Sequence, residues 1–236
     1  MSLGIRIISP GVLLASAILV GFLIGLFGDG IAVCGPSGAT NCIALTDLLA
    51  QDNGLILFYH AYWQFFTSIF VTDSALDAAF NAVAVLVIDR FIDRAINTTR
   101  YFAIFFCSAF LGNLFSLLNG PNYASAGASG GIFGLLAATF SFSWAEQKKI
   151  DQETLILFVL IFVTSSLLGN VDYLAHLGGS IGGFFAGPIL YFALRDRILR
   201  FEPISSSTRF AKVVVATSIG FVIVASIVQF LLFVAS

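Results

Sequence analysis

Charged side chains are scarce in this chain of 236 residues. Only 10% of the residues are charged and 58% are hydrophobic, whereas an ordinary soluble domain carries about 25% charged residues. So few charges cannot cover the surface of a soluble protein, and the net charge of −2 is too small to indicate a charged partner. The composition therefore excludes a soluble enzyme, a nucleic-acid-binding protein and a disordered chain.

Cysteine and histidine are also rare. The three cysteines, Cys34, Cys42 and Cys107, are too few for a disulfide scaffold and show no metal-ligand spacing, so no metal site is expected. Cys34 and Cys42 lie in one loop and would form a disulfide if that loop faces an oxidising compartment. The two histidines are His60 and His176.

Long apolar runs are what the sequence has instead. Several approach the roughly 20 residues that a helix needs to cross a bilayer, and the mean hydropathy is +0.99. The sequence therefore predicts an all-α, polytopic membrane protein. We expect seven spans, at about 11–28, 74–93, 100–117, 129–145, 153–170, 172–194 and 210–235.

The basic residues assign an orientation to these spans. Seven alternating spans put all eleven Lys and Arg residues on one side, and basic loops face the cytoplasm. We therefore expect a multi-pass plasma-membrane protein with a cytoplasmic N-terminus and its C-terminus outside. The long outer loop at 29–73 is rich in aromatics, which settle at the membrane interface. This loop either serves only as an anchor or also takes part in substrate access.

Ser129 is the first candidate for chemistry. It lies at the predicted start of a span, between the small residues Gly127 and Gly130. Small neighbours let a substrate backbone approach the hydroxyl, and free N–H groups at a helix start can stabilise a developing negative charge. A helix cap with a packing seam would leave the same pattern.

His176 is the histidine that lies inside a span, where ionisable residues are functional candidates. Counted from the charged cytoplasmic ends at Glu146 and Arg195, Ser129 and His176 both lie roughly 25–29 Å deep. A bilayer core of about 30 Å puts both slightly below the outer surface. Irregular backbone at that depth must face protein or water, so the spacing predicts a wet pocket open to the outside with both residues at its floor.

Small residues recur on the two spans that carry Ser129 and His176. Gly179 and Gly183 follow His176 at a spacing of four, and further glycines follow Ser129. Such stripes let membrane helices pack backbone to backbone.

These segments resemble the rhomboid intramembrane serine proteases. The family pattern is Gly-x-Ser-Gly followed by Ala-His-x-x-Gly-x-x-x-Gly, which residues 127–130 and 175–183 match. The likeness covers about 11–195. It implies a six-helix protease core at 1–199, including the outer loop 29–73, and one extra transmembrane helix in 200–236.

The resemblance also implies roles for individual residues. Ser129 would be the nucleophile and His176 the general base, without a third carboxylate and without a cofactor. Phe133 matches the aromatic position that packs on the imidazole. The oxyanion would be bound by the Ser129 backbone N–H and the Asn81 side chain. The implied substrates are transmembrane or membrane-associated proteins, cut in or near transmembrane segments at the outer face of the lipid bilayer.

Two positions depart from the family pattern. The family has His-x-x-x-Asn on the second span, whereas this chain has Asp77 four residues before Asn81. Asp77 would repel an oxyanion if ionised and donate to it if protonated; a polar residue facing water is the simpler interpretation. The family's Trp-Arg pair in the outer loop is Trp63-Gln64 here, which puts the anchoring of the loop in doubt.

Asp172 has two candidate roles. It lies four residues before His176 and so on the same helix face. It could orient the imidazole as a third triad member, but a helix N-cap is the expected role.

Two other functions remain as alternatives. One is a catalytically inactive rhomboid-like protein that binds membrane proteins. The other is a small transporter, which would need paired intramembrane charges and an internal repeat that the sequence does not display. The sequence leaves the substrate and the oligomeric state open.

Overall fold

The part of the chain that the structure describes is built from helices, with strands only in two short pairs. The computed structural model describes residues 9–34, 42–72, 74–91, 98–147, 152–167 and 171–199. The long helices are α1 (Pro10–Gly28), α5 (Ala75–Phe91), α6 (Thr98–Ser116), α7 (Ser129–Gln147), α8 (Gln152–Leu167) and α9 (Tyr173–Leu199). The shorter elements are β1 (Ala32–Cys34), β2 (Cys42–Ala44), α2 (Leu45–Leu49), β3 (Gln51–Asp52), α3 (Asn53–Tyr59), α4 (Gln64–Thr67), η1 (Leu117–Asn119) and β4 (Ala124–Ser125).

The six long helices agree with the first six predicted spans to within a few residues. Among the described residues, two helical segments, Pro10–Gly28 and Thr98–Asn119, are long and apolar enough to cross a bilayer by length and composition alone. The expected seventh span at 210–235 and the C-terminal segment 200–236 lie outside the described residues.

Local sequence explains where several helices begin. The Ser9 hydroxyl accepts a hydrogen bond from the Val12 N–H, and Pro10 fills the first helical position of α1, where its missing N–H costs nothing. At α9, the Asp172 carboxylate accepts from the Ala175 N–H. The expected N-cap role of Asp172 is therefore confirmed.

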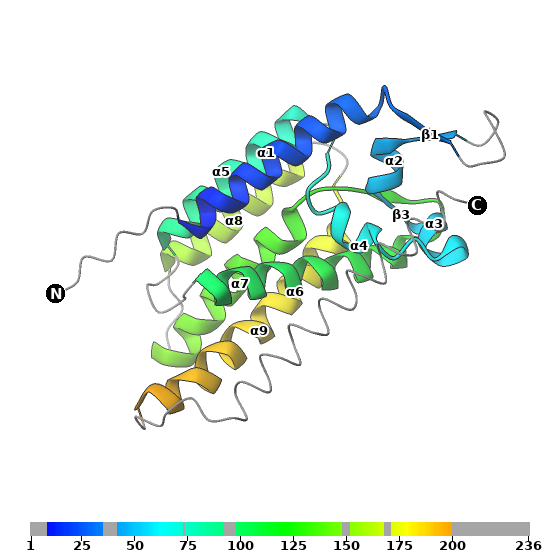
Figure 1. Ribbon diagram of the computed structural model, residues 1–236. Coiled ribbons are helices and arrows are strands. Elements are labelled where there is room, and N and C mark those ends of the chain that lie inside the picture. The colour runs from blue at the N-terminus through cyan, green and yellow to red at the C-terminus, as the bar shows by residue number, and fades with distance from the viewer. Residues whose placement is uncertain are drawn as a thin grey trace.

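Three helices, α6, α7 and α9, form the packed centre of the molecule, while α1 lies along α5 and α8 contacts α7 and α5 (Figure 1). The core between them is apolar and closely filled. It includes side chains of four helices that are at most 2% exposed, namely Leu14, Ile18, Val85, Ile88, Ile104, Phe105, Ile132, Phe133 and Leu135.

Glycines allow α7 and α9 to touch through their backbones. A Cβ atom on Gly179 would lie 2.1 Å from the Gly130 carbonyl oxygen, and one on Gly183 would lie 1.8 Å from the Gly134 carbonyl oxygen. Real Cβ atoms essentially never approach backbone below 3.0 Å. The predicted small-residue stripes are therefore a helix–helix interface.

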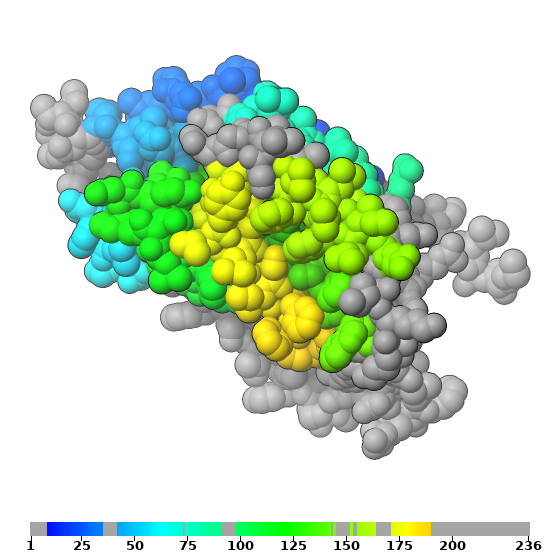
Figure 2. Space-filling view, turned by 180° about the vertical axis from the view of Figure 1, so that it is seen from behind, coloured from blue at the N-terminus to red at the C-terminus, as the bar shows by residue number. Residues whose placement is uncertain are grey.

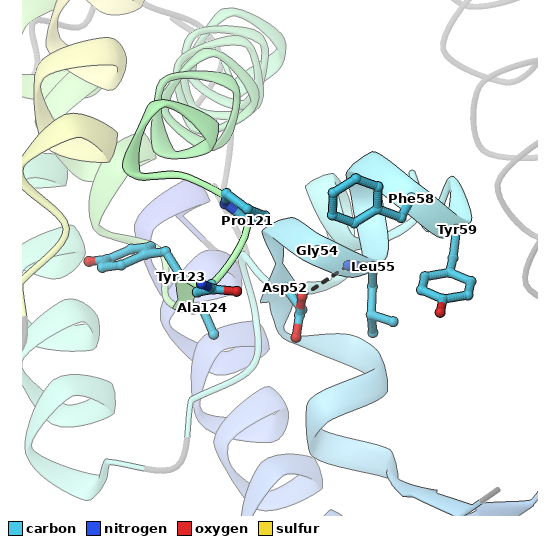
Figure 3. A pocket seen from close by; sticks show the side chains of 9 residues that line it. Asp52, Gly54, Leu55, Phe58, Tyr59, Pro121, Tyr123 and Ala124 are labelled. Atoms are coloured by element: carbon cyan, nitrogen blue, oxygen red, sulfur yellow. Dashed lines mark hydrogen bonds between the residues drawn. The ribbon is translucent and has the colours of Figure 1, made fainter.

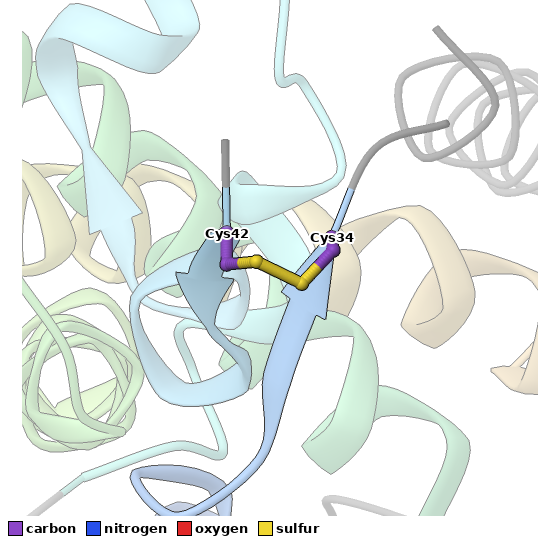
Figure 4. The surroundings of a disulfide bond; sticks show 2 residues. All are labelled: Cys34 and Cys42. Atoms are coloured by element: carbon purple, nitrogen blue, oxygen red, sulfur yellow. A yellow bond between two sulfur atoms is a disulfide. The ribbon is translucent and has the colours of Figure 1, made fainter. Parts of the chain in front are cut away.

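The outer loop 29–73 is mostly folded. Its hairpin β1–β2 is antiparallel and is closed by a disulfide between Cys34 and Cys42 (Figure 4). A second apolar cluster packs against the hairpin and includes Leu48, Ile56 and Trp63. The loop therefore has a small core of its own.

The loop is anchored although Gln64 replaces the family's arginine. The Trp63 indole N–H and the Gln64 amide both donate to the Leu48 carbonyl oxygen, at 2.9 Å and 3.2 Å. The Gln64 amide oxygen accepts from the Asp52 N–H at 2.9 Å, and Gln64 is fully buried. The doubt about anchoring was wrong, because the neutral Gln64 amide binds the backbone of the loop with both a donor and an acceptor.

Large apolar side chains cover the outside of several long helices. On the face shown in Figure 2, α8 and the first half of α9 form much of the surface. Ile156 of α8 and Phe185 and Ile189 of α9 are each more than 60% exposed. Such surfaces fit an apolar solvent better than water.

Candidate active site

The turn before Ser129 requires glycine. Gly127 has φ +125°, a conformation that residues with a Cβ rarely adopt, and its N–H donates to the Ser68 carbonyl oxygen at 2.8 Å. This turn starts α7 at Ser129, whose side chain stays half-buried. The Ser129 hydroxyl therefore stands at a helix N-terminus next to free backbone N–H groups.

The Ser129 hydroxyl meets the imidazole of His176. The distance from Ser129 Oγ to His176 Nε2 is 2.8 Å, and His176 is 5% exposed. Among the described residues, His176 Nδ1 has no hydrogen-bond partner. The two residues that the depth count predicted at one level are thus in direct contact, and no carboxylate completes a triad within the described part of the chain.

Phe133 holds one face of the imidazole. Its ring centroid lies 4.3 Å from that of His176, with the planes tilted by 31°. Phe158 and Phe162 of α8 contact Phe133 edge to face. Because Phe133 is itself 1% exposed, it fixes the ring orientation from a packed position.

Asn81 lies near the turn, hydrogen-bonded to Asp77. Its Nδ2 donates to Asp77 Oδ2 at 2.9 Å, and a Cβ on Gly127 would lie 3.1 Å from that oxygen and 3.7 Å from Asn81 Nδ2. Asn81 is 1% exposed and Asp77 is half-buried. Asp77 is therefore a hydrogen-bond acceptor at the site rather than only a residue facing water.

Asp172 joins the start of α9 to α6. Besides capping α9, its carboxylate accepts from the Ser116 hydroxyl at 2.5 Å and from the Asn119 amide at 3.1 Å. Its hydrogen bonds thus hold the helix that carries His176 rather than the imidazole itself.

A buried amide network near the site was missed from the sequence. The Asn113 amide donates to the Phe65 carbonyl oxygen and the Ser68 hydroxyl, at 2.9 Å and 3.0 Å. The Asn53 amide donates to the carbonyl oxygens of Ser116 and Gly120, both at 2.9 Å. Asn113 and Ser116, two polar residues three apart at the end of an apolar span, are the sequence feature that could have indicated this network.

An open cavity of about 510 Å³ lies between α3 and the segment that leads to β4 (Figure 3). Leu55, Phe58 and Tyr59 line one wall, and Pro121 and Tyr123 the other. Burial, followed by the negative charge of Asp172, raises the pKa of the Tyr123 phenol. Neither Ser129 nor His176 lines this cavity, so it is not where a hydroxyl would attack.

The Ser129–His176 pair has the groups needed for nucleophilic attack on a carbonyl carbon. A serine hydroxyl hydrogen-bonded to an imidazole can lose its proton as it attacks a carbonyl carbon. A helix N-terminus and side-chain amides are the donors that stabilise the oxyanion formed in that step. Among the described residues, no group of three His, Cys, Asp or Glu side chains could hold a metal ion.

Known proteins resemble this chain over more than half of its length. The sequence pattern that defines the rhomboid domain matches residues 59–193, more than half of the chain. The chain is 30% identical over 157 residues to rhomboid protease GluP of Bacillus subtilis, covering 65% of this chain and 31% of that protein. It is 31% identical over 158 residues to RHOMBOID-like protein 1 of Arabidopsis thaliana, covering 65% and 40%.

A third relative is Rhomboid-like protease 3 of Toxoplasma gondii, 35% identical over 129 residues and covering 51% of this chain and 49% of that protein. The chain thus spans about a third to a half of these curated relatives. Membership of the family implies a multi-pass membrane protein. Because the domain pattern matches more than half of the sequence, the chain belongs to the rhomboid family.

Proposed function

We propose that this protein is an intramembrane serine endopeptidase that hydrolyses peptide bonds in or near transmembrane segments of other membrane proteins. The observation that carries the proposal is the 2.8 Å hydrogen bond between Ser129 Oγ and His176 Nε2. Named proteases among the relatives support the reaction class.

The proposed reaction is a two-step acyl transfer. His176 takes the Ser129 proton as Oγ bonds to the scissile carbonyl carbon, and then gives that proton to the leaving amine as the C–N bond breaks. Water next attacks the acyl-enzyme, loses a proton to His176 and releases the new carboxylate, and Ser129 regains its hydrogen. No cofactor or metal takes part.

The oxyanion would be bound by the Ser129 backbone N–H and the Asn81 amide. Two features support this assignment. Ser129 begins α7, where the first backbone N–H groups have no partner within the helix, and the Asn81 amide lies close to the Gly127 backbone. Loss of one such donor typically costs about 2.7–4 kcal/mol in barrier height.

We also propose how the chain crosses the membrane. The protease core would occupy 1–199, with six transmembrane helices, and 200–236 would form one additional helix. We expect a plasma membrane, a cytoplasmic N-terminus, a C-terminus outside and a site that opens to the outer face. The Cys34–Cys42 disulfide supports an oxidising environment for the outer loop.

Cleavage of a single-span substrate by purified protein in detergent tests the proposal. Wild type should cleave, and Ser129→Ala and His176→Ala should not. A serine-reactive fluorophosphonate should label wild type but not Ser129→Ala, which separates the nucleophile from a contaminant. A wild type that neither cleaves several substrates nor becomes labelled would refute the proposal and favour the catalytically inactive binding protein, for which Asp77 in place of the family's histidine is the first indication.

A further inference from the structure

We infer that Asp77 is a positioning residue that fixes the orientation of the Asn81 amide at the oxyanion site. This inference rests on the proposed function. It assigns Asp77 the role of hydrogen-bond acceptor, different from a donor to the oxyanion and from a residue that only faces water.

Asn81 is held at one end of its side-chain amide. Its side chain is 1% exposed, and Asp77 is the side chain that holds its amide among the described residues. The Asn81 amide oxygen is buried without a hydrogen-bond partner in the described part of the chain. Within the described residues, the Asn81 amide is therefore fixed by a hydrogen bond at its nitrogen and not at its oxygen.

The chemistry of the two groups decides which end of the amide Asp77 can bind. A side-chain amide has a nitrogen with two donor hydrogens and an oxygen that only accepts, and an ionised carboxylate only accepts. Asp77 can therefore bind the nitrogen of Asn81 and not its oxygen. One hydrogen goes to Asp77 Oδ2, and the second stays available on an amide that is prevented from flipping.

The pair lies beside the turn that leads to Ser129. Asp77 and Asn81 are four residues apart on α5 and so neighbours on one helix face. Both polar atoms lie close to Gly127, two residues before Ser129. Asp77 also lies in the first turn of α5, where the helix dipole favours a negative charge. The Asp77 carboxylate thus lies where it can orient the Asn81 amide, which is the donor, without being a donor itself.

The experiment is a double-mutant cycle on positions 77 and 81. Asp77→Ala, Asn81→Ala and the double variant are compared with wild type for kcat and KM on a single-span substrate and for the rate of fluorophosphonate labelling. We expect Asn81→Ala to lower kcat about 100-fold and Asp77→Ala about 10-fold with KM unchanged. Because Asp77 acts through Asn81, the double variant should match Asn81→Ala alone.

Asp77→Asn provides a finer test. An amide at position 77 can accept from Asn81 or donate to it, so the orientation is fixed less well and kcat should fall about 3-fold. Asp89→Asn, the same change near the other end of α5, is the matched control and should leave kcat unchanged. Labelling rates should follow kcat, because the phosphoryl oxygen of the probe occupies the oxyanion site.

Three results would overturn the inference while wild type remains active. These are a change in KM alone, a double variant whose loss equals the product of the single losses, and an increase in kcat for Asp77→Asn, which would mean that charge repulsion dominates. A wild type that neither cleaves nor labels would instead refute the proposed function, and the inference with it.

Discussion

Replacing Gly179 by alanine should separate Ser129 from His176. The new Cβ would lie 2.1 Å from the Gly130 carbonyl oxygen, so α7 and α9 must move apart by about 1.3 Å to reach the edge of ordinary contact. Gly130 follows Ser129 directly, and Gly179 is one turn after His176. The same displacement added to the 2.8 Å hydrogen bond gives about 4 Å, which is too long for a hydrogen bond.

The expected loss follows from that distance. A misplacement of about 1 Å between reacting groups can cost about 100-fold in rate, so kcat should fall by about that factor. Overpacking should also lower the free energy of unfolding by about 1–3 kcal/mol. Both are measured on purified protein in detergent, by cleavage of a single-span substrate and by thermal unfolding.

Gly182→Ala is the matched control on the same helix. Its Cβ would meet Ser108 Cα at 3.1 Å and the Leu111 side chain at 3.3 Å, both on α6. These contacts need shifts of only tenths of an ångström, so kcat should stay within about 3-fold of wild type. A Gly179→Ala variant with wild-type kcat, labelling rate and melting temperature would show that the helices do not pack as described.

Three further changes test other parts of the site and loop. Asp172→Asn should keep cleavage within about 3-fold, because it retains a capping side chain and His176 Nδ1 has no partner among the described residues; a loss above about 100-fold in kcat would make Asp172 a triad member. Phe133→Ala should lower the free energy of unfolding by about 3–5 kcal/mol and also lower kcat, and a variant with an unchanged melting temperature would contradict its packing on His176. Cys34→Ser opens the link to Cys42 and should cost about 2–3 kcal/mol of unfolding free energy with cleavage retained. In wild type, thiol labelling of both loop cysteines should require prior reduction, and labelling without it would argue against the disulfide.

The long helices were predictable because apolar run length is a strong one-dimensional signal. The contact between Ser129 and His176 was predictable for a related reason. Both residues can be counted from a charged helix end, and a constant rise per residue turns that count into depth. Glycine spacing then identified the faces that meet. These features depend on local sequence and on the thickness of a bilayer.

The loop contacts were not predictable in the same way. The pairing of β3 with β4 joins Gln51 to Ser125, far apart in the sequence and on strands of only two residues. Such short strands have no period to detect. The effect of Gln64 was predicted wrongly because the missing arginine charge suggested that the loop had lost its anchor. Anchoring the loop requires only one hydrogen-bond donor and one acceptor, and the Gln64 amide has both. Asp77 and Asn81 had a readable four-residue spacing, but the spacing does not say which group accepts.

Helix α6 sets the distance between the Ser129 and His176 side chains although it contributes neither of them. A Cβ on Gly134 of α7 would lie 2.0 Å from the Ser108 Cβ, and one on Gly112 would lie 2.7 Å from the Ala175 carbonyl oxygen. The Ser116 hydroxyl donates to Asp172 at the start of α9. Helices α7 and α9 are thus each held against α6, and a buried, fully packed element changes shape only at a cost in free energy. The 2.8 Å contact between Ser129 and His176 therefore follows from three backbones in mutual contact, and a change on α6 should alter kcat without touching either residue.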